Sequence, residues 1–314
     1  MRAVSWVLAL ALTLTGCVSL PVPPRRRAPA PLPAELAHYY DYTPAPLAAT
    51  FERTEPRSGY TLHRLRLSGP EGITPIRVDW YRPGRAGRHP AILMSPILAG
   101  NDLYVREFAR FYAARGLHAF LVYRQKEPFS ADRPLTDVEE HLRKTLIELR
   151  RALDWVERQE SVDGERIGCF AISLGAILTA LLTAVDPRVR CSVLGLPAGN
   201  VAEILIHSKD KAIRKRRRAW LERHGWTAEK ALEELRRVVR SEPMAFAAGV
   251  DPARVLVIAG LFDRVLGLHR SLALWRAMGR PALVVLPTGH YTAYFTTPYL
   301  KALTYSFLRR KLSR

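Results

Sequence analysis

Hydrophobic and polar positions follow two different periods along this chain. Over Tyr60–Leu67 and Ile76–Tyr81, apolar and polar side chains alternate, and the turn-forming residues 69–72 (GPEG) lie between the two segments. A period of two interrupted by such a turn is typical of an antiparallel β-hairpin. The pattern therefore predicts a hairpin at the edge of a sheet.

Later in the chain, short apolar runs alternate with helical patterns. The apolar runs predict buried strands at Ala91–Met94, Ala119–Val122, Arg166–Ile172, Cys191–Leu196, Val255–Ala259 and Leu283–Leu286. Helical spacing occurs at Leu103–Arg115, about Val138–Gln159 and Leu174–Ala184, and helical segments follow the last two strands. Buried strands joined by helices are typical of a mostly parallel sheet that is covered on both faces. The sequence thus predicts an α/β fold with a doubly wound, mostly parallel sheet.

An insertion at about 197–250 interrupts this alternation after the sixth predicted strand. It contains a cationic stretch, Lys209–Trp220, followed by a helical run through Arg240. We expect a helical cap over the end of the sheet, whose cations would attract an acidic substrate or a lipid surface. The alternative is an ordinary solvated helix face.

The first residues have the pattern of a targeting signal. A positive start is followed by the apolar run Ala3–Leu14, which is shorter than the ~20 residues that cross a bilayer. Residues 14–17 read LTGC and resemble the bacterial lipobox. That resemblance implies a lipoprotein signal peptide at 1–16, cleavage before Cys17 and lipid modification of the Cys17 thiol. A plain secretory signal with a chance cysteine is the alternative.

Residues 17–50 are predicted to link the lipid to the folded domain at 51–314. They are dense in proline over Pro21–Pro33, and proline-rich chain stays extended without packing. This predicts a semi-rigid membrane tether. Val18 stands where an Asp would resemble an inner-membrane retention signal, so we expect the bacterial cell envelope, at the outer membrane and facing the periplasm.

Composition sets the class of protein. The 314 residues are 48% hydrophobic and 25% charged, which fits one large globular domain or two small ones and excludes wholesale disorder and a multi-span membrane protein. The formal net charge of +19 favours contact with anionic surfaces, although a generally Arg-rich composition explains it as well. Nucleic-acid binding is disfavoured because the chain is expected to be exported and has no recognition motif.

The cysteines and histidines show no metal-type spacing, so no metal site is expected. Cys169 and Cys191 lie in apolar runs. Buried thiols are the expectation at such positions, with a disulfide as the alternative in an oxidising compartment.

A candidate nucleophile lies at a junction between a predicted strand and a predicted helix. Residues 171–175 read AISLG, which is similar to the G-x-S-x-G nucleophile elbow with Ala171 in place of the first glycine. Small residues two positions before and after Ser173 let the crowded backbones approach. The turn would expose the Ser173 hydroxyl at a helix N-terminus, where negative charge is favoured. The alternative is a serine that only caps its helix.

Two further polar residues follow later strands. Asp263 comes after the strand at 255–259 and His290 after the strand at 283–286, and parallel sheets gather reactive groups at these ends. The order Ser173, Asp263, His290 resembles that of the α/β-hydrolase superfamily, and in particular its dienelactone hydrolase and esterase-like members, from about residue 51 onward. The resemblance implies that Ser173 is the nucleophile, His290 the general base and then acid, and Asp263 the orienting carboxylate. A turn-forming Asp and a loop His are the alternatives.

The resemblance also implies an oxyanion hole of two backbone N–H groups. One belongs to Leu174. The other is expected in the loop after the strand at 91–94, where many relatives have His-Gly and this chain has Ser95-Pro96-Ile97. Because proline has no N–H, the Ile97 amide is the candidate.

Two functions follow as hypotheses. The first is a serine hydrolase that cleaves a carboxylic ester or related acyl bond of a small-molecule or lipid-like substrate through an acyl-enzyme, without a cofactor. Peptidases and acyltransferases share the same triad. The second is a non-catalytic envelope lipoprotein that uses a hydrolase scaffold and its basic cap to bind a partner. The oligomeric state stays open.

Overall fold

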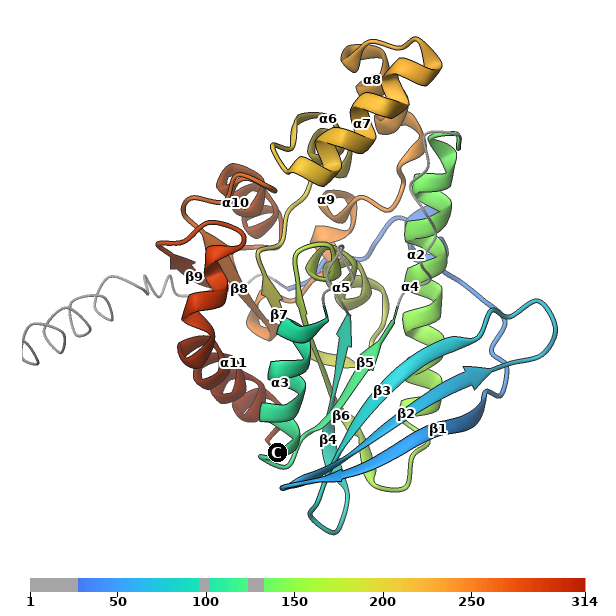
Figure 1. The fold of residues 1–314 in the computed structure, drawn as a ribbon, viewed down its shortest axis with the longest axis vertical. Coiled ribbons are helices and arrows are strands. Elements are labelled where there is room, and N and C mark those ends of the chain that lie inside the picture. The colour runs from blue at the N-terminus through green and yellow to red at the C-terminus, as the bar shows by residue number, and fades with distance from the viewer. Residues whose placement is uncertain (1–27, 96–101, 124–132, 314) are drawn as a thin grey trace, which may run out of the picture.

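The computed structural model describes residues 28–95, 102–123 and 133–313 (Figure 1). The predicted signal peptide, Cys17 and Ile97 lie outside these residues. Within the described residues, one sheet has the strand order β1-β2-β3-β5-β4-β6-β7-β8-β9. The strands are β1 (Ala48–Arg57), β2 (Tyr60–Ser68), β3 (Ile76–Pro83), β4 (His89–Ser95), β5 (His118–Val122), β6 (Val162–Ile172), β7 (Val189–Gly195), β8 (Val255–Gly260) and β9 (Ala282–Leu286).

Strands β4 to β9 are parallel to one another, while β1, β2 and β3 are joined in antiparallel pairs. The predicted hairpin and the mostly parallel α/β sheet are therefore confirmed. The sequence pattern missed β1, which forms the sheet edge. Most of its side chains are exposed, so backbone pairing with β2 defines this strand and no alternating apolar pattern reveals it.

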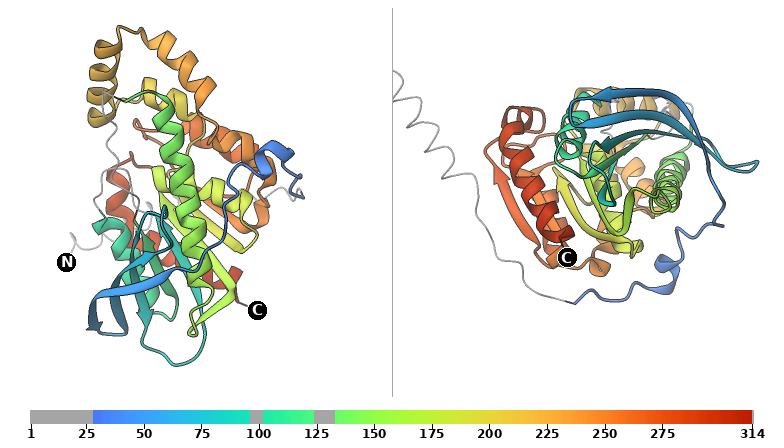
Figure 2. Two further views of the ribbon diagram at one scale, coloured as in Figure 1. Left: turned by 90° about the vertical axis from the view of Figure 1, so that its right-hand side faces the viewer. Right: turned by 90° about the horizontal axis from the view of Figure 1, so that it is seen from below.

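Helices cover both faces of the sheet (Figure 2). The helices are α2 (Ala34–Ala37), α3 (Leu103–Ala113), α4 (Thr136–Val156), α5 (Leu174–Val185), α6 (Val201–His207), α7 (Lys211–His224), α8 (Ala228–Val238), α9 (Pro243–Phe246), α10 (Leu268–Ala277) and α11 (Thr297–Leu312). Apolar side chains of α3 and α11 pack on one face, and those of α4, α5 and α10 pack on the other. No helix of the described ranges combines the length and apolarity needed to cross a bilayer.

The two cysteines of the described sheet are buried free thiols. Cys191 pairs with Gly168 in the β6–β7 register, and Cys169 pairs with Ser192. Because neighbouring positions of a strand point to opposite faces, the thiols enter different apolar clusters. The disulfide alternative is thereby excluded, and burial raises the pKa of both thiols.

The segment that was predicted to be an unpacked membrane tether differs in part from that prediction. Part of segment 28–50 packs on the domain: Tyr40 is fully buried, and its hydroxyl donates a hydrogen bond to Ser241 Oγ at 2.8 Å. Tyr39 donates to Glu139 at 2.7 Å, and Tyr42 donates to Asp154 at 2.8 Å. A buried tyrosine combines apolar area with a polar tip that finds a partner. The expectation of an unpacked spacer up to residue 50 therefore fails for these residues, and the folded domain begins before residue 51.

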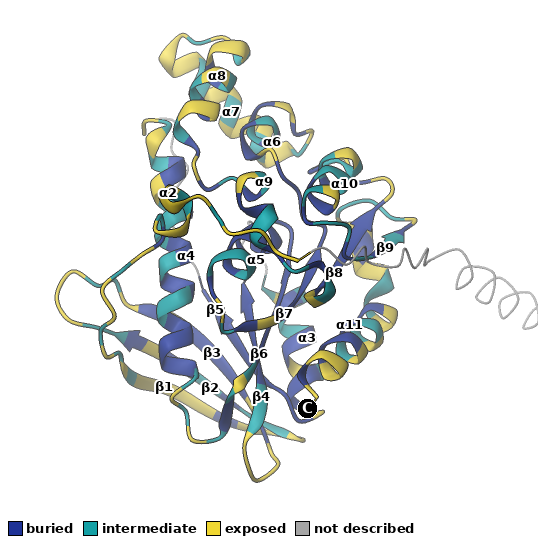
Figure 3. Ribbon diagram, turned by 180° about the vertical axis from the view of Figure 1, so that it is seen from behind, coloured by how far each residue is buried: buried dark blue, intermediate teal, exposed yellow. Residues whose placement is uncertain are grey.

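The insertion between β7 and β8 carries helices α6 to α9, and Figure 1 shows it above the C-terminal ends of the parallel strands. Two buried or partly buried carboxylates hold its ends. Glu242 accepts hydrogen bonds from the N–H groups of Asn200 and Val201, at 2.8 and 2.7 Å. Glu139 of α4 accepts from the N–H groups of residues 240 and 241. Helices α7 and α8 remain largely exposed (Figure 3).

We predict that His118 makes the stability of the fold pH-dependent. It is fully buried on β5, accepts from Trp80 Nε1 at 3.0 Å, donates to Ser161 O at 2.8 Å, and burial lowers its pKa to about 4. Between pH 6.5 and 4 the unfolded chain binds a proton that the folded chain does not. The free energy of unfolding should therefore decrease as the pH is lowered from 6.5 to 4, by up to ~1.4 kcal/mol per pH unit.

The substitution His118→Gln removes this titration, so the free energy of unfolding should depend less on pH. Urea titrations of both proteins at pH 7, 6 and 5 measure this dependence. Identical slopes would contradict the assignment.

Candidate active site

Ser173 occupies a strained turn between β6 and α5. Its φ of 58° and ψ of −127° are a backbone conformation that residues with a Cβ rarely adopt. The turn is held on both sides. The Ser173 N–H donates to Gly195 O on the neighbouring strand at 2.9 Å, and the Ser173 carbonyl accepts from Ala176 N and Ile177 N in the first turn of α5. Strand and helix together therefore determine where the hydroxyl points.

Asp263 is held by the loop that follows β8. Its Oδ1 atom accepts hydrogen bonds from the N–H groups of Val265 and Leu266, at 2.8 and 3.0 Å. The loop lies against the chain that follows β9, and a Cβ on Gly260 would come within 2.9 Å of Thr288 O. A glycine is thus required at the end of β8 for the two loops to approach.

The three side chains form a continuous hydrogen-bonded relay. His290 Nδ1 lies 2.8 Å from Asp263 Oδ2, and His290 Nε2 lies 2.9 Å from Ser173 Oγ. Because an ionised carboxylate only accepts, Nδ1 carries the proton and Nε2 accepts from the serine hydroxyl. The structure thus brings together all three residues that the sequence singled out, although 117 and 27 positions separate them.

Burial and hydrogen bonding act in opposite directions on the Asp263 carboxyl. Burial raises its pKa, while the hydrogen bond and charge of His290 and the N–H groups of Leu266 and Val265 lower it, and the net pKa is below the usual value. The carboxylate therefore stays ionised although only 1% of the Asp263 side chain is exposed. A buried negative charge at this position stabilises a protonated imidazole.

The candidate oxyanion hole is described in part. Leu174 is the first residue of α5, so its N–H belongs to the helix N-terminus directly after Ser173. Free N–H groups at this end attract a developing negative charge. The second candidate donor, Ile97, falls among the residues that the structure does not describe. In the described parts of the chain, no cluster of three or more His, Cys, Asp and Glu side chains is suited to a metal.

A contact that sequence reasoning missed joins the His290 loop to the cap. The Tyr291 hydroxyl donates a hydrogen bond to Asp210 Oδ2, across 81 positions. Asp210 also caps α7, because its Oδ1 accepts from the N–H groups of Ala212 and Ile213. Burial and the bond to Asp210 raise the pKa of Tyr291 to about 12. The only signal in the sequence is that Tyr291 follows His290, and nothing there indicates its partner.

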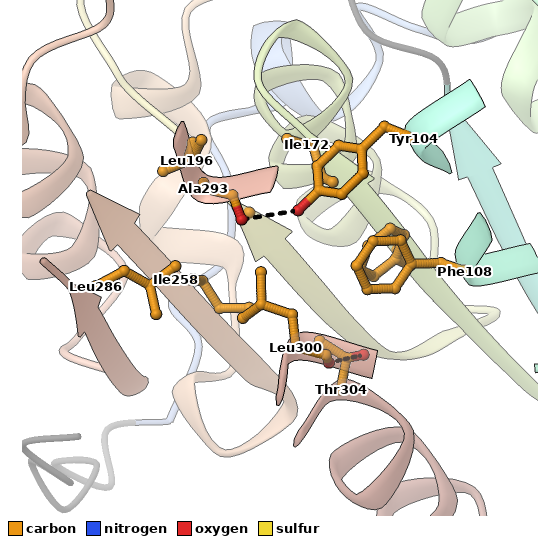
Figure 4. Close-up of a pocket in the computed structure, with 11 residues that line it drawn as sticks. Tyr104, Phe108, Ile172, Leu196, Ile258, Leu286, Ala293, Leu300 and Thr304 are labelled. Atoms are coloured by element: carbon orange, nitrogen blue, oxygen red, sulfur yellow. Dashed lines mark hydrogen bonds between the residues drawn. The ribbon is translucent and has the colours of Figure 1, made fainter. Parts of the chain in front are cut away.

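A small apolar cavity of about 20 Å³ lies among β6, β8, β9, α3 and α11 (Figure 4). Ile172, next to Ser173, lines it together with Tyr104 and Phe108 of α3, and the Tyr104 hydroxyl points to Ala293 O at 3.4 Å. Ligand pockets usually measure ~300–1,000 Å³. This cavity is therefore far smaller than a typical ligand pocket.

Comparison with solved structures identifies the architecture. Acetyl xylan esterase 1 from Thermoanaerobacterium sp. superposes with a TM-score of 0.69 at 17% identity, over 92% of this chain and 97% of that one. This chain has the α/β-hydrolase fold. In this fold the nucleophile, the acid and the histidine follow one another along the chain in that order, and Ser173, Asp263 and His290 have the same order.

Sequence relatives match only part of this α/β-hydrolase fold. An uncharacterized protein of Mycobacterium tuberculosis is 27% identical over 154 residues, which are 47% of this chain and 33% of that protein. A probable 2-oxo-3-(5-oxofuran-2-ylidene)propanoate lactonase of Bradyrhizobium sp. is 30% identical over 118 residues, or 36% of this chain and 47% of the lactonase. The chain thus spans between a third and a half of these curated relatives. No family model matches it.

Replacing Asp263 by Asn tests the relay. The Asn amide still accepts from Val265 N and Leu266 N through its oxygen, so the loop and the melting temperature should change little. Its NH2 group would face His290 Nδ1 and favour the tautomer with the proton on Nε2. We expect kcat/KM for a chromogenic ester to fall by on the order of 10³–10⁴-fold. A fall of less than tenfold would show that Asp263 does not orient the imidazole.

Proposed function

We propose that this protein is a serine hydrolase that cleaves a carboxylic ester or related acyl bond through an acyl-enzyme on Ser173. One observation carries the proposal: the hydrogen-bonded relay from Ser173 through His290 to Asp263, at the C-terminal edge of a parallel sheet. A serine hydroxyl is a weak nucleophile at its free pKa and needs an adjacent base that a third group orients. The relay supplies both.

The chemistry follows from the positions of these atoms. His290 Nε2 takes the proton as Ser173 Oγ attacks the acyl carbon, and Asp263 stabilises the resulting imidazolium. The negative oxygen of the tetrahedral intermediate would lie at the Leu174 N–H and, by the sequence assignment, the Ile97 N–H. His290 then protonates the leaving alcohol. Water activated by the same imidazole hydrolyses the acyl-enzyme and restores Ser173.

The compared proteins support an ester as the substrate. The structural neighbour is named an esterase, and the partial relative from Bradyrhizobium is named a lactonase; a lactone is a cyclic ester. The assembled relay favours catalysis over the binding-only alternative, because a binding scaffold needs no proton path between a serine and a buried carboxylate. Peptidase and acyltransferase chemistry would use the same three side chains, and a panel of acyl substrates separates them.

Labelling by a fluorophosphonate probe tests the nucleophile. Such a probe phosphonylates an activated serine, so the wild-type protein should be labelled and Ser173→Ala should not. Ser68→Ala, at the last residue of β2 in the edge hairpin, is a matched serine variant that should label like the wild type. Turnover of p-nitrophenyl acetate should fall in Ser173→Ala by on the order of 10⁶-fold, to background. Equal labelling of Ser173→Ala and the wild type would overturn the proposal.

We also propose that the enzyme is attached to the bacterial envelope through a lipidated Cys17, at the outer membrane and facing the periplasm. The support is the LTGC pattern after a short apolar run. Two or more acyl chains hold a protein stably on a bilayer, whereas one does so only marginally.

Cys17→Ala tests this attachment in cells. We expect radioactive palmitate to label the wild-type protein in the membrane fraction and to leave Cys17→Ala unlabelled. Cys169→Ala is the control, because this thiol is buried. Palmitate incorporation that survives Cys17→Ala would contradict the assignment.

A further inference from the structure

Large apolar side chains are exposed around the reactive residues. They come from three separate segments: the start of α3, the loop before Asp263, and the 3₁₀ turn (η3, Thr292–Thr296) after His290 with the residues beside it. Their exposed fractions reach 80% for Phe295, 66% for Leu103 and 61% for Phe262. The set, which we name the rim, comprises Leu103, Leu261, Phe262, Tyr291, Tyr294 and Phe295. A large exposed apolar patch marks an interaction site more often than an accident of folding.

Contacts among the three segments show that the rim is continuous with the catalytic loop. The rings of Tyr104, beside Leu103, and Tyr294 lie 5.3 Å apart. Phe262 N donates to Thr288 O at 3.0 Å, two residues before His290. The rings of His290 and Tyr291 are 5.5 Å apart. The rim therefore lies next to the catalytic histidine rather than elsewhere on the surface.

The cationic helix α7 is joined to this rim through the Tyr291–Asp210 hydrogen bond. Along it, Arg218 pairs with Glu222. Lys209, just before α7, and four exposed cations of the helix have no acidic side chain within 4 Å among the residues that the structure describes; the four are Lys211, Arg214, Lys215 and Arg216. Clustered like charges repel one another and oppose the compact state. Because these cations lie beside the apolar rim, the surface is complementary to a partner that is anionic and partly apolar.

We infer that the rim and helix α7 form one surface that docks onto an anionic phospholipid bilayer. Phenylalanine and leucine enter the boundary between headgroups and acyl chains, tyrosine sits at the headgroup level, and Lys and Arg meet the anionic phosphates. Charge complementarity and apolar area thus point to the same partner. This inference rests on the proposed hydrolase function in one respect: docking would bring the active site to acyl esters held in the membrane, which would then be its substrates.

Two other occupants fit the surface less well. An acidic polysaccharide would meet the cations and stack on tyrosines, but Leu103, Leu261 and Phe295 offer it no hydrogen bonds. A second copy of this chain would cover the apolar rim but would bring a second set of cations, because the net charge is +19. Neither occupant is complementary to both the apolar rim and the cations of α7, whereas an anionic bilayer is complementary to both.

A fluorescent probe at position 295 tests docking in the full chain. Phe295→Cys is labelled with an environment-sensitive nitrobenzoxadiazole in a Cys17→Ala, Ser173→Ala background; Cys169 and Cys191 are buried and stay unlabelled. We expect a blue shift and brighter emission on phosphatidylglycerol vesicles, and little change on phosphatidylcholine vesicles. Phe51→Cys on β1 is the matched control, since Phe51 is an exposed Phe at the opposite sheet edge and should not respond.

Removing charge from α7 tests whether its cations contribute to binding of the anionic bilayer. The triple variant Arg214→Gln, Lys215→Gln, Arg216→Gln should weaken partitioning to phosphatidylglycerol vesicles on the order of 100-fold. High salt should weaken wild-type binding in the same direction. Melting temperatures close to the wild type should show that these exposed substitutions leave the fold intact.

Four results would overturn the inference: equal responses at positions 51 and 295, equal responses on neutral and anionic vesicles, a shift that depends on protein concentration without lipid, or a shift produced by polygalacturonate and not by vesicles. The third would indicate self-association and the fourth a polysaccharide surface. Because the background lacks Ser173, the docking readout does not depend on catalysis. Failure of the proposed hydrolase function would therefore appear in probe labelling and leave the docking result standing.

Discussion

The parallel pairing of β6, β7, β8 and β9 is the constraint on which the site depends. Parallel strands end at the same edge of a sheet, so residues that immediately follow β6, β8 and β9 are brought to one place. The register of these strands then sets the positions of the three side chains more closely. Ser173 bonds to the end of β7 through Gly195, and the Asp263 loop contacts the chain after β9 because residue 260 is a glycine. A shift of one residue in any of these pairings would separate the reactive atoms.

Two carboxylates, the buried Glu139 and the half-buried Asp210, connect parts of the chain that lie outside the sheet. Glu139 accepts from the N-terminal Tyr39 and from the end of the cap insertion, so that it ties both segments to α4. Asp210 caps α7 and accepts from Tyr291, the residue after His290. Each accepts hydrogen bonds from several donors at once, and for Glu139 these bonds compensate the cost of burying a charge. The cap is therefore coupled to the rest of the domain at defined atoms.

The proposed contact with a membrane rests on how charge and apolar area are distributed over the surface. The rim places aromatic and aliphatic side chains beside the reactive centre, and α7 adds cations that have little use in the packing of the domain. Two independent features, the lipobox-like N-terminus and the rim, suggest the same kind of surface as a partner. The N-terminal feature would keep the protein near a membrane, and the rim would orient the site toward it.

The sequence alone determined the type and order of most elements, because buried parallel strands and amphipathic helices impose their own hydrophobic periods. It also indicated Ser173, Asp263 and His290, since each stands just after an apolar strand. The sequence pattern did not reveal edge strand β1, because its side chains are mostly exposed. It did not reveal the packing of Tyr39, Tyr40 and Tyr42 either, because their partners lie about a hundred or more positions away. Only the tertiary structure decided the separation of Cys169 from Cys191, the Tyr291–Asp210 contact and the rim. Each depends on which faces and loops meet in space, and that information is carried by long-range packing rather than by any local pattern.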